Sequence, residues 1–234
     1  MKTALISSEL KLISAGTEAM DWKEKVFADF CLYAVTDIKT KSPDILKKIE
    51  RAYCGGTDIV QLRSKVLSDG ALMRLGFRVK KIAQKHRKLF FINDRVDLAL
   101  AIGADGVHLG QEDMPVRAAR RLMKKAGVKL WIGKSTHSLK QALAAVSQGS
   151  DYIGVGPVFV TPTKPDAKSV GFRFVKQAAM KIRIPWVAIG GIDLGNIRDV
   201  IEAGATRVAV VRAIFAAQDP ENAARKLKHQ MEGM

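Results

Sequence analysis

The chain has 234 residues and lacks most features that would place it in a specialised class. It contains only two cysteines, Cys31 and Cys54, and both lie among apolar neighbours, so neither a disulfide framework nor a zinc site is expected. No stretch approaches the roughly 18 uninterrupted apolar residues of a membrane span. Glu9 and Lys11 interrupt the first apolar run too early for a secretory signal. The sequence therefore predicts a protein of a reducing, cytoplasmic compartment that has no membrane contact.

Familiar catalytic and nucleotide-binding motifs are absent as well. The sequence has no GxGxxG fingerprint, no phosphate-binding loop with its lysine, no HExxH, no GxSxG and no CxxC. Aromatic residues make up 6% and lie mostly within apolar runs. Proteins that bind single-stranded nucleic acid interleave aromatic with basic residues, so we expect no nucleic-acid partner.

What the chain has in excess is positive charge. Its 39 lysines and arginines against 23 acidic residues give a net charge of +16. Such a field attracts nucleic acid, anionic membranes or phosphorylated metabolites. We interpret most of these charges as solvated helix faces, because Arg74, Arg78, Lys81 and Lys85 recur at the spacing of one outer face. A basic nucleic-acid-binding protein stays a distant alternative.

From residue 30 onward, short apolar runs alternate with helical patterns. The runs are almost continuously apolar, as parallel strands buried on both faces require. This order predicts an α/β fold, a single (β/α)₈ TIM barrel over residues 30–234 that follows an N-terminal extension over 1–29. A doubly wound sheet is the alternative. The predicted strands cover residues 30–36, 58–62, 89–93, 105–109, 130–135, 151–157, 186–191 and 207–212. The predicted helices cover residues 42–54, 68–87, 95–102, 115–127, 137–148, 171–182, 195–203 and 220–231.

Polar residues follow these strands, at the end of a barrel where TIM-barrel chemistry takes place. Arginine and lysine bind phosphate oxygens, and Mg²⁺ takes one or two carboxylates while substrate phosphates complete its shell. The pattern therefore predicts a site for a diphosphate carried with Mg²⁺, and Gly190–Gly191 suggest a second anion site. The rim cations are Arg63, Lys65, Lys164 and Arg212, and the carboxylates among them are Asp94 and Asp113.

These residues also have structural interpretations. Asp94 and Asp113 each precede a predicted helix, so either could be a helix cap. Arg63 and Lys65 could pair with neighbouring acidic residues. His108 lies inside an apolar strand, and we interpret it as a packed core residue.

An ordered set of motifs, one at each strand end, resembles the thiamine-phosphate synthase family. The resemblance runs from about residue 31 to the C-terminus, and the order of the motifs makes it specific. The motifs are YAVTD (33–37), QLRSK (61–65), INDR (92–95), DGVHLGQED (105–113), STH (135–137), YIGVGPVF (152–159), TPTK (161–164), AIGGI (188–192) and VAVVRAI (208–214).

The resemblance implies a Mg²⁺-dependent transferase of thiamine biosynthesis with two phosphorylated substrates. It would join 4-amino-2-methyl-5-(diphosphooxymethyl)pyrimidine to a thiazole phosphate, giving thiamine phosphate and diphosphate. The resemblance implies catalytic roles for Lys164, Arg63 and Ser135, and Mg²⁺ ligation by Asp94 and Asp113. The pyrimidine diphosphate site would use Gln61, Leu62, Arg63, Ser64, Lys65, Asn93, Ser135 and Lys164. The thiazole phosphate site would use Thr161, Pro162, Thr163, Gly191, Val211 and Arg212.

Three positions depart from the usual family pattern. Lys134 replaces an apolar residue, Val160 a proline and Arg212 a serine. A related barrel, a thiazole tautomerase that uses histidine acid–base chemistry, is kept as an alternative because of His137. A sugar-phosphate isomerase or aldolase barrel is a more distant one.

Overall fold

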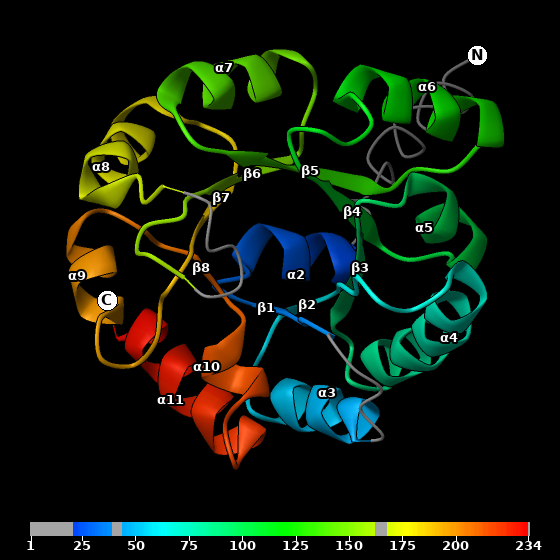
Figure 1. Ribbon diagram of the computed structural model, residues 1–234, viewed down its shortest axis with the longest axis horizontal. Coiled ribbons are helices and arrows are strands. Elements are labelled where there is room, and N and C mark those ends of the chain that lie inside the picture. Colours follow the sequence, from blue (N-terminus) through cyan, green and yellow to red (C-terminus); the bar gives the residue numbers. More distant parts are fainter. Residues whose placement is uncertain (1–20, 39–43, 162–167, 234) are drawn as a thin grey trace, which may run out of the picture.

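The computed structural model describes residues 21–38, 44–161 and 168–233 of the chain. Eight parallel strands close into a barrel in which each strand pairs with the next along the chain and β8 pairs with β1 (Figure 1). This confirms the predicted TIM barrel and excludes the doubly wound sheet. The strands are β1 (Leu32–Val35), β2 (Ile59–Leu62), β3 (Leu89–Asn93), β4 (Gly106–Leu109), β5 (Trp131–Thr136), β6 (Tyr152–Val155), β7 (Trp186–Ile189) and β8 (Val208–Val210).

Helices connect successive strands and surround the barrel (Figure 1). They are α3 (Ile45–Cys54), α4 (Asp69–Lys85), α5 (Val96–Ile102), α6 (Val116–Ala126), α7 (Leu139–Ser147), α8 (Gly171–Lys181), α9 (Ile197–Glu202) and α11 (Pro220–Glu232). The predicted end of the last strand was wrong. The strand expected to reach Arg212 stops at Val210, and Arg212 instead begins the short helix α10 (Arg212–Phe215).

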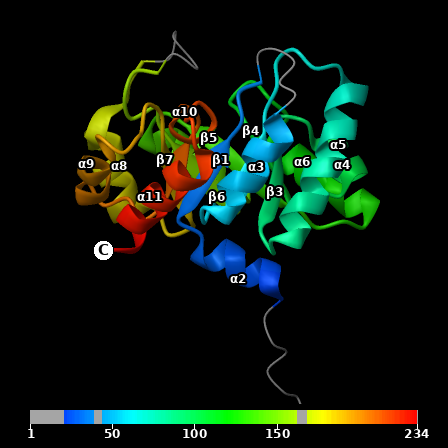
Figure 2. The same cartoon turned by 90° about the horizontal axis from the view of Figure 1, so that it is seen from below.

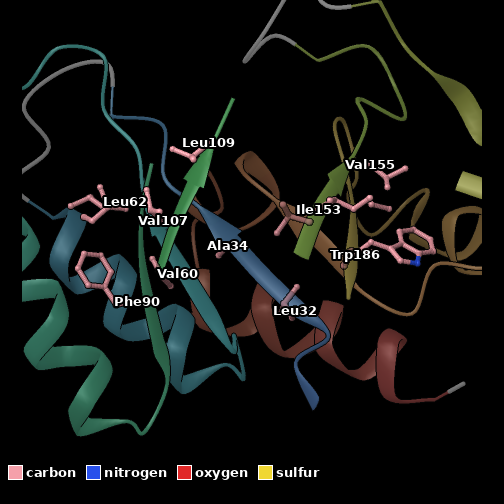
Figure 3. Close-up of a cluster of buried hydrophobic side chains, with 14 of the residues drawn as sticks. Leu32, Ala34, Val60, Leu62, Phe90, Val107, Leu109, Ile153, Val155 and Trp186 are labelled. Atoms are coloured by element: carbon pink, nitrogen blue, oxygen red, sulfur yellow. The ribbon is translucent and has the colours of Figure 1, made fainter. Parts of the chain in front are cut away.

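Each strand is buried on both faces, which explains its continuous apolar sequence. Alternate side chains point outward into the layer between strands and helices, where Leu32, Ala34, Val60, Leu62 and Phe90 belong to one apolar cluster (Figure 3). The other set points into the barrel and forms a second cluster that includes Tyr33, Ile59, Phe91, Tyr152 and Val187. The core is therefore two concentric apolar layers.

The N-terminal end of the barrel is covered by helix α2 (Trp22–Asp29), which lies beneath the strands (Figure 2). The ring of Phe27 stacks on Trp131 with centroids 4.6 Å apart, and it also packs on Phe91 and Tyr152. Lys23 forms an ion pair of 2.7 Å with Asp105. The boundary predicted at residue 30 thus separates α2 from a barrel against which it packs.

The same end carries a repeated aspartate. Strands β2, β4 and β6 are each preceded by an aspartate whose carboxylate accepts a backbone N–H from the neighbouring odd-numbered strand, which ties the strand starts together. The pairs are Asp58 with Leu32 at 3.1 Å, Asp105 with Phe90 at 2.9 Å and Asp151 with Ile132 at 2.6 Å. Before β8 the residue is Arg207, which donates to the carbonyl of Ala28 in α2 at 2.9 Å.

Candidate active site

A cavity of about 560 Å³ opens at the opposite end, where the strands finish, and all eight strands contribute to its wall. A cavity at the carboxyl ends of barrel strands is where TIM-barrel enzymes bind their substrates. Its polar and glycine lining includes Tyr33, Gln61, Arg63, Asn93, His108, Ser135, His137, Thr161, Gly190, Gly191 and Arg212.

The structure brings most residues of the predicted pyrimidine diphosphate site together. Gln61, Arg63, Asn93 and Ser135 come from three different strands and the loop after β2, and all line this cavity. The side chain of Leu62 does not, because successive residues of a strand point to opposite faces; it is fully buried in the outer apolar layer (Figure 3).

The hydroxyl of Ser64 makes hydrogen bonds to the backbone around its own loop. Its hydroxyl donates to the carbonyl of Ile38 and accepts the N–H groups of Val66 and Leu67, at 3.1–3.2 Å. These bonds fix the turn after β2 that carries Arg63 and Lys65. The structure therefore gives Ser64 a role in shaping this loop.

Arg63 and Lys65, the two cations of this loop, form ion pairs with acidic residues, as the structural interpretation of the sequence expected. Arg63 forms an ion pair with Asp37, and both side chains are largely buried. Lys65 Nζ lies 3.2 Å from Asp94 Oδ2, but its side chain is 63% exposed. Arg63 is thus held rigidly in the cavity wall, whereas Lys65 reaches from solvent toward the carboxylates.

Asp94 and Asp113 lie together, and neither caps a helix. Their carboxyl groups interact, and the residues at the caps of α5 and α6 are Arg95 and Pro115. Asp94 adopts a left-handed backbone conformation, with φ of 63°, which is unusual for a residue other than glycine. Such strained conformations are concentrated at functional sites. The capping interpretation is therefore wrong for both aspartates.

The electrostatics of the pair suit a divalent cation. Burial, together with the neighbouring Asp113 carboxyl group, raises the pKa of Asp94 above its ordinary value. Two carboxylates that compete for one proton form a donor set that Mg²⁺ accepts. Within the described residues no cluster of three or more His, Cys, Asp or Glu side chains exists, so water or substrate oxygens would complete the shell of such an ion.

The residues predicted for the thiazole phosphate fall on the same cavity wherever they are described. Thr161, Gly191, Val211 and Arg212 line it, while Pro162, Thr163 and Lys164 lie outside the described residues. Gly191 has φ of 66°, and a Cβ there would lie 2.8 Å from Cβ of Phe159. Only glycine fits this position, and it leaves backbone exposed to the cavity.

Sequence reasoning missed that buried polar side chains at the cavity form one hydrogen-bonded network. His108 is buried as predicted, but its Nε2 lies 2.9 Å from Ser135 Oγ and its Nδ1 lies 2.9 Å from the hydroxyl of Tyr152. Tyr33 and Gln61 continue this network. The sequence could have indicated this network, because the alternation of side chains along each strand places all of these residues on the inward face.

His137, which kept the tautomerase alternative open, also lines the cavity. Its Nδ1 contacts the carbonyl of Gly156 at 2.5 Å. Its ring is therefore held by a backbone group.

Comparisons with known proteins identify the family of this chain. The family model described as thiamine monophosphate synthase matches residues 32–214. The chain belongs to this family. A solved structure from Pyrococcus furiosus, described as thiamine phosphate pyrophosphorylase, superimposes with a TM-score of 0.80 at 36% identity, covering 87% of this chain and 96% of that one.

Two curated relatives carry the name thiamine-phosphate synthase. The Synechococcus sp. protein is 43% identical over 227 residues, which cover 97% of this chain and 64% of that protein. The Thermus thermophilus protein is 49% identical over 190 residues, which cover 81% of this chain and 90% of that protein. This chain thus spans less than two thirds of the first relative and most of the second. Over its described segments, no helix combines the length and apolar character needed to cross a membrane.

Proposed function

We propose that this chain condenses 4-amino-2-methyl-5-(diphosphooxymethyl)pyrimidine with a thiazole phosphate, yielding thiamine phosphate and diphosphate. The observation that carries the proposal is one cavity with two sets of anion-binding groups. Arg63 lines it together with Asn93, and Gly191 lines it together with Arg212. Two phosphorylated substrates that must react with each other need such an arrangement. The names of the relatives support the same reaction.

The reaction needs little from the protein beyond positioning and charge. The bond between the methylene carbon and the diphosphate oxygen breaks, and the lone pair of the thiazole nitrogen forms the new carbon–nitrogen bond. The 4-amino group pushes electrons toward the methylene carbon, so diphosphate can depart ahead of attack. Because the nucleophile already has a lone pair, neither a protein nucleophile nor a strong base is required.

The protein's main task is to stabilise the departing diphosphate. Arg63 is held at the cavity wall by Asp37 and offers its guanidinium to phosphate oxygens, and Lys65 adds a point charge. Lys164, outside the described residues, is proposed to add a third cation. Mg²⁺ held by Asp94 and Asp113 would supply further positive charge to the diphosphate oxygens.

A direct assay tests the proposal. The protein is mixed with Mg²⁺ and both substrates, and thiamine phosphate and released diphosphate are measured. We expect both products in equal amounts, with turnover strongly reduced in Arg63→Gln. Arg95→Gln is the matched control, because Arg95 pairs with Asp69 and Asp97 at the surface outside the cavity. Absence of product, or equal loss in both variants, would contradict the proposal.

A further inference from the structure

Five side chains form a continuous hydrogen-bonded chain across the inside of the barrel. It runs from Gln61 through Tyr33, Tyr152 and His108 to Ser135. The successive distances are 2.8 Å (Gln61 Nε2 to Tyr33 Oη), 2.8 Å (Tyr33 Oη to Tyr152 Oη), 2.9 Å (Tyr152 Oη to His108 Nδ1) and 2.9 Å (His108 Nε2 to Ser135 Oγ). Gln61 and Ser135 line the cavity, so the chain begins and ends where a ligand would bind.

The orientation of the Gln61 amide decides in which direction the links of this chain donate. Gln61 donates an amide N–H to Tyr33. Each tyrosine has one hydroxyl hydrogen, and in the arrangement that uses it within the chain Tyr33 donates to Tyr152 and Tyr152 donates to Nδ1 of His108. A neutral imidazole that accepts at Nδ1 carries its hydrogen on Nε2 and donates it to Ser135. The hydroxyl hydrogen of Ser135 is thereby left to donate into the cavity.

Turning the amide of Gln61 by 180° reverses every link. The amide oxygen then accepts from Tyr33, Tyr152 donates to Tyr33, and the hydrogen of His108 moves to Nδ1. Ser135 must then donate to Nε2 and can only accept from a ligand. The two arrangements differ in heavy atoms only by the exchange of Oε1 and Nε2 of Gln61, and each satisfies every link of the chain. What differs is the polarity that Gln61 and Ser135 present to the cavity.

We propose that Tyr33, Tyr152 and His108 form a relay that couples recognition of an aminopyrimidine at Gln61 to the donor state of Ser135. The inference rests on the proposed function. An aminopyrimidine presents an N–H donor beside a ring-nitrogen acceptor. Gln61 presents an oxygen and an N–H to the cavity in either arrangement, but in opposite order. An aminopyrimidine bound with its amino group facing the amide oxygen of the first arrangement selects that arrangement, in which Ser135 donates to the diphosphate.

The surroundings of the two tyrosines support a relay of this kind. Tyr33 and Tyr152 are at most 1% exposed, so water does not compete for their hydroxyls. Burial raises the pKa of both well above the ordinary value, which keeps both hydroxyls protonated. Gly133 makes room for one of them, since a Cβ there would lie 2.1 Å from Cζ of Tyr152. Tyr152 does not line the cavity, so in this proposal it is a positioning residue.

The relay predicts a measurable coupling between two separate ligands. We would titrate the wild-type protein with Mg²⁺ and inorganic diphosphate, in the absence and presence of the saturating pyrimidine alcohol, 4-amino-2-methyl-5-(hydroxymethyl)pyrimidine. Calorimetry should show diphosphate affinity rising about fivefold or more when the alcohol is present, within the usual range of coupling between sites. Tyr152→Phe and Tyr33→Phe each break one link, so in both variants the ratio of the two affinities should fall to about one.

Tyr53→Phe is the matched control. Tyr53 is also a buried tyrosine, 3% exposed, whose hydroxyl donates 2.8 Å to the carbonyl of Leu89, but it lies outside the relay. This variant should keep the full coupling. Nitrogen NMR of His108 gives a second readout: adding the alcohol should place the hydrogen on Nε2 in the wild type and leave its position unchanged in Tyr152→Phe.

Two results would overturn the relay. One is an affinity ratio near one in the wild type. The other is an affinity ratio that stays well above one in Tyr152→Phe, because coupling by direct contact between the two ligands would persist in that variant. If Tyr152→Phe does not fold, Tyr33→Phe gives the same test. Either result, in a protein that still forms thiamine phosphate, contradicts the relay alone. Failure to form product contradicts the proposed function instead.

Discussion

Asp58 at the N-terminal end of this barrel and Asp94 at the C-terminal end have opposite surroundings. At the N-terminal end, Asp58 lies between two cations, with its oxygens 2.8 Å from Lys88 and 2.6 Å from Lys228. At the C-terminal end, Asp94 lies beside a second carboxyl group, that of Asp113. The first arrangement satisfies a buried charge, whereas the second brings two like charges together.

The pKa directions express this difference. Burial alone would raise the pKa of Asp58, but the attraction of Lys88 and Lys228 outweighs it and holds the pKa below the ordinary value. The pKa of Asp94 is raised. Asp58, at the end of the barrel that α2 closes, thus stabilises the fold. Asp94, at the open end that holds the cavity, lies in an arrangement that a bound cation would relieve. Residues that stabilise the fold and residues proposed for the chemistry thus lie at opposite ends of the same barrel.

The largest expected effect is on activity at the open end. Asp94→Asn should lower kcat by about 10³-fold, or ~4 kcal/mol, the scale of losing one electrostatic group in a catalytic site. Its free energy of unfolding should be unchanged or higher, because the raised pKa of Asp94 means that its folded surroundings disfavour the charged carboxylate. Steady-state kinetics and urea unfolding measure the two. Glu112→Gln, an exposed residue on the neighbouring loop, should change neither, and a clear loss of stability in Asp94→Asn would contradict the comparison.

The closed end should respond in the reverse manner. Asp58→Asn leaves Lys88 and Lys228 without their carboxylate, and breaking a buried ion pair costs about 3 kcal/mol or more. Urea unfolding should show this loss, while kcat for the folded protein stays near the wild-type value. A fall in kcat without a fall in stability would show that the two ends are not separate.

The aromatic cover of the closed end should matter somewhat less. Phe27→Ala removes the ring that stacks on Trp131, and for a half-buried phenylalanine we expect a loss of about 2 kcal/mol. Phe77, 43% exposed on α4, gives the matched control, and Phe77→Ala should unfold like the wild type. Equal effects of the two substitutions would mean that α2 contributes nothing to stability.

The smallest expected effect is on the stability of the protein at acidic pH. Because the folded-state pKa of Asp58 is lowered, its contribution is complete above the unfolded-state value of about 3.9 and is lost as the pH falls through the folded-state value. Between those two values the stability of the wild type should fall more steeply with decreasing pH than that of Asp58→Asn. Urea unfolding at several acidic pH values tests this, and parallel curves would contradict it.

Much of the fold was predictable because its signals are local. Continuous apolar runs gave the strands, since each strand is covered on both faces. Gly103, Gly149 and Gly204 each follow a helix with φ between 65° and 103°, a conformation that glycine adopts without strain. The position of a polar residue after a strand sufficed to place it at the open end, because all strands of a parallel barrel point the same way.

The sequence by itself therefore determined the elements, their order and the residues at each end of the barrel. The tertiary structure decided which of those residues meet. Tyr33 and Tyr152 are 119 residues apart, and Arg63 and Asp37 come from neighbouring strand ends. It also decided that α2 folds beneath the barrel rather than extending from it. Such contacts depend on the closure of the whole barrel, since register and curvature are set by all eight strands together and not by any single segment.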